Sequence, residues 1–435
     1  MNSLFEPVVR GLYAWVLRLA TPIYFWRLWL RGRREPGYRF RMGERLGFYP
    51  GRRPLPGAVW LHAVSLGETR AALPLIEALR ALQPEMRLLL THGTATGRAA
   101  GRKLLHELDG QVWLPYDTPG AMRRFLRHFQ PCVGVVMETE LWPSLMREAE
   151  KATVPIVMAN ARLSERSANR GQRFAALMHP AAARLSLALA QTADDAQRLR
   201  EAGVPQAMVC GNLKFDVTPA ARLVAMGLQW REGLNRAVVV AASTREGEEG
   251  PLLAAWTSLP TPRPLLLLVP RHPQRFEEVA ALVRMQALTL MCRSDWDDRP
   301  PLVAGEMDVW VGDSMGEMAL YYACADVALL GGSFAPLGGQ NLIEAAACGC
   351  PVIMGPHTFN FAQAAKQALA ARAALQVEDI NHAMKEAVAL VNSPDRNEWV
   401  QRSLAFANAH RGAAALMAHQ IWQRSQRWRE AGDLD

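Results

Sequence analysis

Carboxylates that directly follow apolar segments are the first candidates for chemistry in this chain. Glu68 lies in the motif SLGET at 65–69, immediately after the apolar segment 58–64. Gly67 permits a tight turn from a strand into a helix. A carboxylate at the start of that helix could act as a general base that takes a proton from a hydroxyl group. The alternative is that Glu68 only caps the helix and complements its dipole.

A second motif, METELWP at 137–143, places Glu138 and Glu140 after another apolar segment. Carboxylates at the end of a buried strand are costly unless they are paired or lie in a cleft. If strand geometry continues through this motif, both side chains point to the same side of the sheet. The alternative is the start of a helix, with Pro143 at an early helical position.

Two cations also follow apolar segments. Arg162, in NARLS at 160–164, could hold an anionic group or pair with one of the glutamates of METELWP. Lys214, in GNLKFD at 211–216, could neutralise a departing phosphate. The alternatives without a functional role are a salt bridge within a loop for Arg162 and a solvated lysine in a linker for Lys214.

The second half of the chain offers candidates for anion binding. Arg271, in PRHP at 270–273, follows an apolar segment and could grip a phosphate or a carboxylate. The turn GDSMGE at 312–317 would leave main-chain N–H groups available to a ligand.

A glycine-rich segment is the strongest of these candidates. Gly331-Gly332-Ser333 and Gly338-Gly339 precede the sequence NLIE at 341–344. A glycine-rich loop that opens a helix predicts a phosphate cradle, and Glu344 could accept hydrogen bonds from ribose hydroxyls. The spacing matches neither the dinucleotide motif nor the P-loop, so a nucleoside monophosphate site fits better. The alternative is a set of tight turns without a ligand.

These motifs need a scaffold that places them at one edge of a sheet. Apolar segments alternate with helical patterns, which predicts an α/β fold with parallel sheets covered on both faces. The pattern restarts near 237, so we expect two Rossmann-like doubly wound domains that face a cleft. The expected parts are an N-terminal segment at 1–35, a domain at 36–216 and a domain with C-terminal helices at 217–435. The expected strands are 58–64, 87–92, 111–117, 132–138, 154–160, 187–192, 207–212, 237–243, 264–270, 288–293, 308–313, 327–333 and 350–355.

The N-terminal segment is apolar and rich in aromatic residues, but it carries interruptions. Arg10, Arg18 and Arg27 interrupt residues 8–30, and Pro22 is expected to break the segment in its middle. The pattern favours an interfacial membrane anchor, with aromatic rings at headgroup depth and arginines on anionic lipid. A single membrane span, or a helix packed on the protein's own core, are the alternatives.

Composition limits the class of protein. The chain has 435 residues, 50% of them hydrophobic, and this profile is globular. The formal net charge of +8 favours an anionic partner, whether nucleic acid, anionic lipid or an acidic small molecule. The six cysteines form no CxxC pair, so neither a zinc site nor a disulfide framework is expected.

Taken together, the motifs resemble those of the Kdo transferases, which add the acidic sugar 3-deoxy-D-manno-octulosonic acid to the lipid A precursor. They occur in the order of that family over residues 65–361, and MGERLGFY at 42–49 resembles its N-terminal region. SFAPL at 333–337 lies where family members differ among themselves. The motifs that carry the resemblance are SLGET, ETELWP, NARLS, GNLKFD, PRHP, GDSMGE, GGS, NLIEAA and GPHTFNF.

The resemblance implies a GT-B fold and inverting transfer of Kdo from CMP-Kdo to the lipid A precursor, without a metal or another cofactor. It implies that Glu68 is the general base and that Glu138 and Lys214 stabilise the transition state. The implied surroundings are the anionic cytoplasmic face of the cell inner membrane, with no nucleic acid. The alternatives are a GT-B enzyme with another nucleotide sugar and a non-enzymatic nucleotide-binding protein at a membrane surface. The implied CMP-binding residues are Pro270, Arg271, Met315, Gly316, Glu317, Asn341, Leu342, Ile343 and Glu344.

Overall fold

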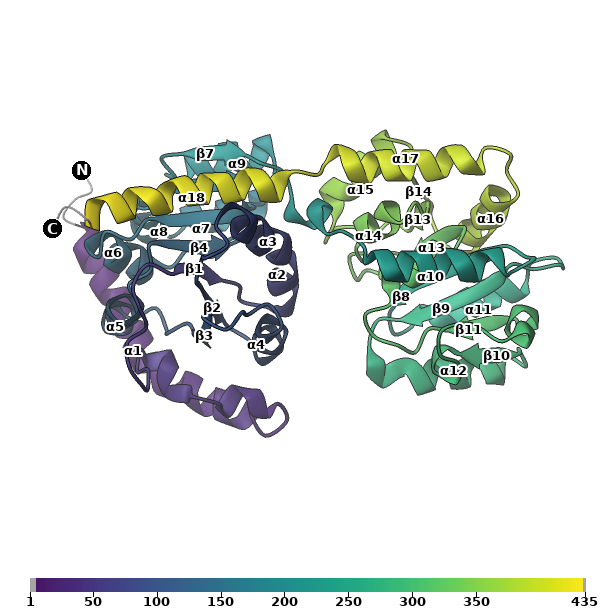
Figure 1. Ribbon diagram of the computed structural model, residues 1–435, viewed down its shortest axis with the longest axis horizontal. Helices are drawn as coiled ribbons and strands as arrows, with labels where there is room; N and C mark the ends of the chain where they lie inside the picture. Colours follow the sequence, from purple (N-terminus) through teal and green to yellow (C-terminus); the bar gives the residue numbers. More distant parts are fainter. Residues whose placement is uncertain (1–4, 433–435) are drawn as a thin grey trace. The chain divides into compact units, whose positions relative to one another are not determined.

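The computed structural model describes residues 5–432. These residues form two compact units (Figure 1). The first unit consists of the residues up to Val217 together with those from Arg411 onward. The second unit spans Thr218–His410. Each unit contains one seven-stranded sheet in which all neighbouring strands are parallel.

The sheet of the first unit is doubly wound. Its strand order is β3-β2-β1-β4-β5-β6-β7, so the direction of winding reverses between β1 and β4. In open sheets of this kind, ligands bind outside the carboxyl ends of the strands at that reversal point. The strands are β1 (Val59–His62), β2 (Leu88–His92), β3 (Gly110–Trp113), β4 (Val133–Met137), β5 (Ile156–Ala161), β6 (Leu187–Ala190) and β7 (Ala207–Val209).

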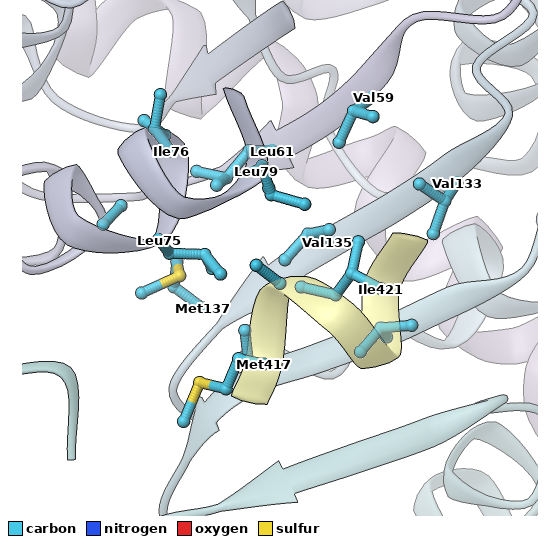
Figure 2. Packing of buried hydrophobic residues seen from close by; sticks show 14 of the residues in the cluster. Val59, Leu61, Leu75, Ile76, Leu79, Val133, Val135, Met137, Met417 and Ile421 are labelled. Carbon is cyan, nitrogen blue, oxygen red and sulfur yellow. The ribbon is translucent and has the colours of Figure 1, made fainter. Parts of the chain in front are cut away.

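Helices cover both faces of this sheet because its strands are apolar on both sides. One buried cluster joins β1 and β4 to α3 and to the C-terminal helix α18, and Figure 2 shows this packing. A second buried cluster lies on the other face, under α5 and α6. The helices are α2 (Leu66–Ala71), α3 (Leu73–Leu82), α4 (Ala95–Arg102), α5 (Pro119–Phe129), α6 (Pro143–Lys151), α7 (Glu165–Gln172), α8 (Ala175–Ala182) and α9 (Ala193–Glu201), with 3-10 turns η1 (Pro36–Arg39), η2 (Met42–Leu46) and η3 (Leu213–Asp216).

The end of the chain returns to the first unit, which corrects the expectation that the second domain runs to residue 435. Helix α18 (Ala413–Gly432) packs on α3, with Met417 and Ile421 fully buried in the cluster of Figure 2. The carboxylate of Asp216 accepts hydrogen bonds from the amides of Gly412 and Ala414, both at 2.6 Å. The physical reason is that the apolar face of α18 completes the cover over β4.

The sheet of the second unit has the order β10-β11-β9-β8-β12-β13-β14, and its winding reverses between β8 and β12. All thirteen expected strands correspond to observed ones, whereas β14 was not predicted because Ala-Leu-Gln is too short to form a recognisable apolar run. The strands are β8 (Val238–Thr244), β9 (Leu265–Pro270), β10 (Leu290–Cys292), β11 (Val309–Val311), β12 (Val327–Leu330), β13 (Val352–Met354) and β14 (Ala374–Gln376). The helices are α10 (Ala221–Glu232), α11 (Glu249–Thr257), α12 (Phe276–Met285), α13 (Met318–Cys324), α14 (Leu342–Ala347), α15 (Ala362–Ala370), α16 (Ile380–Val391) and α17 (Arg396–Ala409).

The N-terminal helix α1 (Phe5–Arg31) is continuous, so the expectation that Pro22 breaks it is wrong. A proline removes one main-chain hydrogen bond from a helix, and packing of α1 against the first unit offsets that loss. The hydroxyl of Tyr13 donates to Asp117 at 3.0 Å, and Ala14 is buried. Within residues 5–432, no helix has both the length and the apolar character of a membrane span, so the single-span alternative is not supported.

Candidate functional site

Glu68 lies at the carboxyl edge of the first sheet, in the turn that leads from β1 into α2. The hydroxyl oxygen of Ser65 caps the helix by accepting from the Glu68 amide at 3.3 Å. The Glu68 carboxylate accepts from the Val64 amide at 2.8 Å and from the Ser65 hydroxyl at 2.9 Å. The predicted turn is therefore present. The carboxylate also folds back on the start of its own helix, which is the capping role that the alternative interpretation gave it.

Burial changes the acidity of Glu68. Partial burial raises the pKa of its carboxyl group to about 7, although the hydrogen bonds from Val64 and Ser65 oppose that shift. The negative charges of Glu138 and Glu140 raise the pKa further. A carboxylate with a pKa near neutrality is well suited to proton transfer at physiological pH.

Glu138 is the first residue beyond β4, the strand that pairs with β1 at the reversal point. Its main chain is left-handed, with φ of 56°, and its amide donates to the Ala159 carbonyl at 2.9 Å. The strand geometry therefore ends at Met137, and the premise that Glu138 and Glu140 continue the strand is wrong. A left-handed residue outside glycine and asparagine is strained, and such strain is often found at functional sites.

Glu140 belongs to the start of the next helix, as the alternative interpretation of METELWP anticipated. Pro143 is the first residue of α6, with Trp142 before it as the N-cap. The Glu140 carboxylate accepts from the indole N–H of Trp142 at 2.6 Å. Burial raises the pKa of Glu140, and the charge of Glu138 acts in the same direction. METELWP thus contributes negative charge around Glu68.

Lys214 lies in the turn η3, which hydrogen bonds of amide side chains hold against the sheet. The side-chain oxygen of Asn160, at the end of β5, accepts from the Leu213 amide at 3.1 Å. Asn212 donates to Gln191 at 3.1 Å and accepts from the Lys214 amide at 3.0 Å. Lys214 is therefore part of an ordered turn near the ends of β5 and β6, and its side chain is half-buried.

Arg162 does not make the predicted ion pair with Glu138 or Glu140 among the residues that the structure describes. Its main-chain amide donates to the Glu138 carbonyl at 3.3 Å, and its side chain is exposed. Of the two roles predicted for Arg162, the ion pair with a glutamate is therefore wrong, and the binding of an anionic group stays a prediction.

In the second unit, Arg271 follows β9 and presents an exposed side chain. Its amide donates to the Thr244 carbonyl at 2.9 Å, which links the ends of β8 and β9. The charges of Arg245, Arg271 and Arg275 all lower the pKa of His272, although burial contributes most. Pro270 is buried at the end of β9, so its side chain belongs to the core. The cluster of these arginines lies at the carboxyl end of β9.

The turn after β11 holds Met315, Gly316 and Glu317. Met315 is exposed, and Gly316 has φ of 87° with no atom near the position of a Cβ. Glu317 is engaged within the protein, because the guanidinium of Arg293 donates to both of its carboxylate oxygens, at 3.0 and 3.1 Å. The sequence alone did not indicate that Arg293 is the partner of Glu317.

The glycine-rich loop after β12 differs from the predicted phosphate cradle. The amide of Gly332 donates to both carboxylate oxygens of Glu248, at 2.9 and 2.7 Å, and the Arg245 amide donates to the same carboxylate at 2.9 Å. A Cβ on Gly331 would meet the Ser243 carbonyl oxygen at 2.4 Å, so only glycine allows this approach. An internal carboxylate therefore occupies one main-chain N–H group of the predicted cradle.

The segment at 341–344 divides into buried and accessible parts. Leu342 and Ile343 are each 1% exposed, so their side chains belong to the core and only their main chain could face a ligand. Asn341 accepts from the Ile343 amide at 3.1 Å and donates to Glu344 at 3.0 Å. Asn341 and Glu344 remain half-buried and are the polar groups of this segment.

The predicted site residues thus form two groups. Glu68, Glu138 and Lys214 belong to the first unit, and all the predicted CMP-binding residues belong to the second. The sequence did not indicate three residues that hold these segments in place, because each contacts a residue far away along the chain. They are Asn160, Glu248 and Arg293. Among the side chains of residues 6–426, no group of three His, Cys, Asp or Glu residues is arranged to hold a metal ion.

Comparison with known proteins places this geometry in context. The family model of 3-deoxy-D-manno-octulosonic-acid transferase (kdotransferase) matches residues 40–217. The 3-deoxy-D-manno-octulosonic acid transferase of Bordetella pertussis is 45% identical over 93% of this chain and 96% of its own. That of Haemophilus influenzae is 35% identical over 89% of this chain and 92% of its own. The crystal structure of a glycosyltransferase from Rickettsia africae has a TM-score of 0.56 at 12% identity, covering 86% of this chain and 99% of that one.

Two doubly wound units with parallel seven-stranded sheets define a GT-B-like architecture. The likeness to the Rickettsia africae structure supports this fold alone. The 45% identity over almost the entire length is more specific. The chain belongs to the 3-deoxy-D-manno-octulosonic acid (Kdo) transferase family.

Proposed function

We propose that this protein transfers Kdo from CMP-Kdo to a hydroxyl group of the lipid A precursor, with inversion at the anomeric carbon and with Glu68 as the general base. The observation that carries the proposal is the partly buried Glu68 carboxylate at the reversal point of the first sheet, with a pKa of about 7. Membership of the Kdo transferase family supports the choice of sugar.

In the proposed reaction, Glu68 takes the proton of the acceptor hydroxyl while the hydroxyl oxygen attacks the anomeric carbon of the donor. The bond between that carbon and the phosphate oxygen breaks, and its electron pair leaves with CMP. Glu138 and Lys214 are the proposed transition-state residues, and the ordered turn of Lys214 supports a fixed position for its charge.

The second unit is the proposed donor-binding unit. Arg271 provides a cation for the CMP phosphate, and Asn341 and Glu344 provide polar groups for the ribose. Met315 and Gly316 offer an accessible turn, whereas Glu317 supports it through Arg293. Since CMP-Kdo carries one phosphate and releases no pyrophosphate, the proposed reaction requires no metal and no other cofactor.

The proposed place of action is the anionic cytoplasmic surface of the inner membrane, reached through helix α1. One face of α1 packs on the first unit, while the opposite face exposes large apolar side chains. An amphipathic helix of this kind lies in the plane of a membrane surface, and nearby arginines attract anionic lipid. The exposed apolar residues are Val8, Leu12, Trp15, Val16, Leu19, Ile23, Trp26 and Trp29.

Vesicle sedimentation tests this membrane proposal. We expect the full chain to bind vesicles containing phosphatidylglycerol more tightly than vesicles of phosphatidylcholine alone. The double substitution Leu12→Glu and Leu19→Glu should abolish that binding, whereas Leu228→Glu, at an exposed position of the second unit, should not. Equal binding by all three proteins would reject α1 as the attachment site.

The proposed transfer is tested by incubating the protein with CMP-Kdo and the lipid A precursor and measuring the mass of the lipid product by mass spectrometry. We expect Glu68→Gln to lower the rate by about 10² to 10⁴ while CMP binding persists. Glu77→Gln, at an exposed position of α3, is the matched control. If the Glu68→Gln variant is as active as the wild type, Glu68 is not the general base. If transfer occurs only from another nucleotide sugar, CMP-Kdo is not the donor.

A further inference from the structure

A cavity of about 290 Å³ lies in the first unit between the C-terminal half of α1 and the carboxyl edge of the sheet. Tyr24 and Leu28 of α1 form one wall, and Tyr116 and Trp142 contribute aromatic rings from the body of the unit. A volume near the lower end of the range for ligand pockets suits one part of a larger ligand.

The charged residues around this cavity are all cations. Arg27, Arg31 and Arg45 line it, and no aspartate or glutamate does. Arg45 is 5% exposed, stacks over the Trp113 ring at 4.1 Å and donates to the Gly93 carbonyl at 3.3 Å. Arg27 has no ion-pair partner among the side chains of residues 6–426. The cavity is therefore suited to a ligand that combines an anionic group with a less polar body.

His62 adds an unused hydrogen-bonding position. Its side chain lines the cavity and is 1% exposed, and its Nδ1 atom lies 2.9 Å from the Thr91 hydroxyl and 3.2 Å from the Thr91 carbonyl. Its Nε2 atom is buried and has no partner in the described structure. Burial lowers the pKa of His62 to about 3, so the ring is neutral. In either tautomer, Nε2 can make one hydrogen bond to a ligand.

The walls of the cavity are linked to the proposed catalytic carboxylates. Val64 lines the cavity, and its amide is the group that donates to Glu68 at 2.8 Å. Trp142 also lines it, and its indole N–H donates to Glu140 at 2.6 Å. A ligand in the cavity would therefore lie next to the turn that carries Glu68.

We infer that this cavity binds a phosphorylated sugar unit of the acceptor lipid, with Arg27 on the phosphate and His62 Nε2 on a sugar hydroxyl. This inference rests on the proposed transfer to a lipid acceptor. Aromatic rings suit the faces of a sugar, and guanidinium groups suit a phosphate. Binding here holds the acceptor beside Glu68, so that the attacking hydroxyl is positioned before the donor reacts.

The test measures steady-state transfer in detergent micelles, where attachment to a membrane plays no part. The full chain is compared with Arg27→Gln, with His62→Gln and with the control Arg127→Gln, an exposed arginine of α5 outside the cavity. Each protein is assayed with the phosphorylated acceptor and with the same lipid after removal of its phosphates.

We expect Arg27→Gln to raise the KM for the phosphorylated acceptor by about ten-fold, the effect of one charge-assisted hydrogen bond. Its KM for CMP-Kdo and its kcat should remain within about two-fold of the wild type by the same reasoning. With the dephosphorylated acceptor, the Arg27→Gln variant and the wild type should behave alike. Arg27→Gln lies at an exposed position and decides the question even if the buried His62→Gln variant does not fold.

Two results would overturn the inference: an unchanged acceptor KM in Arg27→Gln, or an equal rise with both acceptors, which would indicate an acyl-chain pocket or a structural effect. If the wild type transfers nothing from CMP-Kdo, the proposed function fails by itself. Calorimetric titration with the phosphorylated disaccharide then decides on the cavity alone, since Arg27→Gln should weaken that binding by about ten-fold and Arg127→Gln should not.

Discussion

The side-chain oxygen of Asn160 accepts a hydrogen bond from the main-chain amide of Leu213 at 3.1 Å. This single contact joins the end of β5 to the turn that carries Lys214, across more than fifty residues of sequence. Asn160 is fully buried and has a left-handed main chain with φ of 51°. Asparagine tolerates that conformation better than most residues. Asn160 therefore forms the turn of its own main chain and also holds the turn that carries Lys214.

Asn160→Ala should therefore lower transfer activity without unfolding the first unit. The Leu213 amide would lose its partner, at a cost of about 1 to 3 kcal/mol in unfolding free energy. Thermal unfolding and kcat measured on the same preparation check this expectation, with Asn169→Ala on the exposed face of α7 as the control. If the Asn160→Ala variant is destabilised but fully active, the position of Lys214 does not matter for catalysis.

The pH dependence of transfer should report the acidity of Glu68. A general base acts only when deprotonated, and the pKa of Glu68 is raised to about 7. We expect kcat/KM to increase with unit slope below that pH and to become constant above it. A profile that is flat between pH 5 and 8 would contradict the assignment of about 7.

Glu140→Gln provides a sharper form of that test. The charge of Glu140 is one of the causes that raise the pKa of Glu68, although it is smaller than burial. Removing the charge should shift the acidic limb of the pH profile to lower pH, because the Glu68 carboxylate becomes easier to ionise. A profile identical to that of the wild type would show that Glu140 does not act on the titrating group.

Tyr13→Phe should weaken the attachment of α1 to the first unit. The Tyr13 hydroxyl donates to Asp117, which also accepts from the amides of Ser144 and Leu145 at the start of α6. The loss of one such bond costs about 0.5 to 1.5 kcal/mol. Chemical denaturation checks this value, and Tyr24→Phe, whose hydroxyl has no hydrogen bond in the described structure, should have no comparable effect.

Glu248→Ala should disturb the glycine-rich loop. It would leave the amides of Gly332 and Arg245 without their carboxylate, at a cost of about 1 to 3 kcal/mol in stability. We also expect weaker CMP binding in calorimetry, because the loop loses its fixed shape. Glu246→Ala, at the exposed neighbouring position, is the control. Unchanged CMP affinity in Glu248→Ala would place the nucleotide away from this loop.

The strands were predictable because each buried parallel strand is a continuous apolar run, which does not depend on distant residues. The turn at Glu68 was predictable for the same reason, since Ser65 and Gly67 act locally. The role of Glu248 was not, because its partner Gly332 lies 84 residues further along the chain, in the loop after β12. Nor was the end of the domain, because the helical pattern of α18 shows an apolar face without showing which sheet that face covers.

The return of α18 also affects how the protein is made. A ribosome releases the first unit's sheet long before it synthesises Met417 and Ile421, the residues that cover part of that sheet. Until then, the apolar surface of α3 and β4 has no permanent cover, although domains usually fold in the order of their synthesis. The second unit must therefore emerge while the first is still unfinished. A stop codon just before Met417 would therefore damage the unit that was translated first.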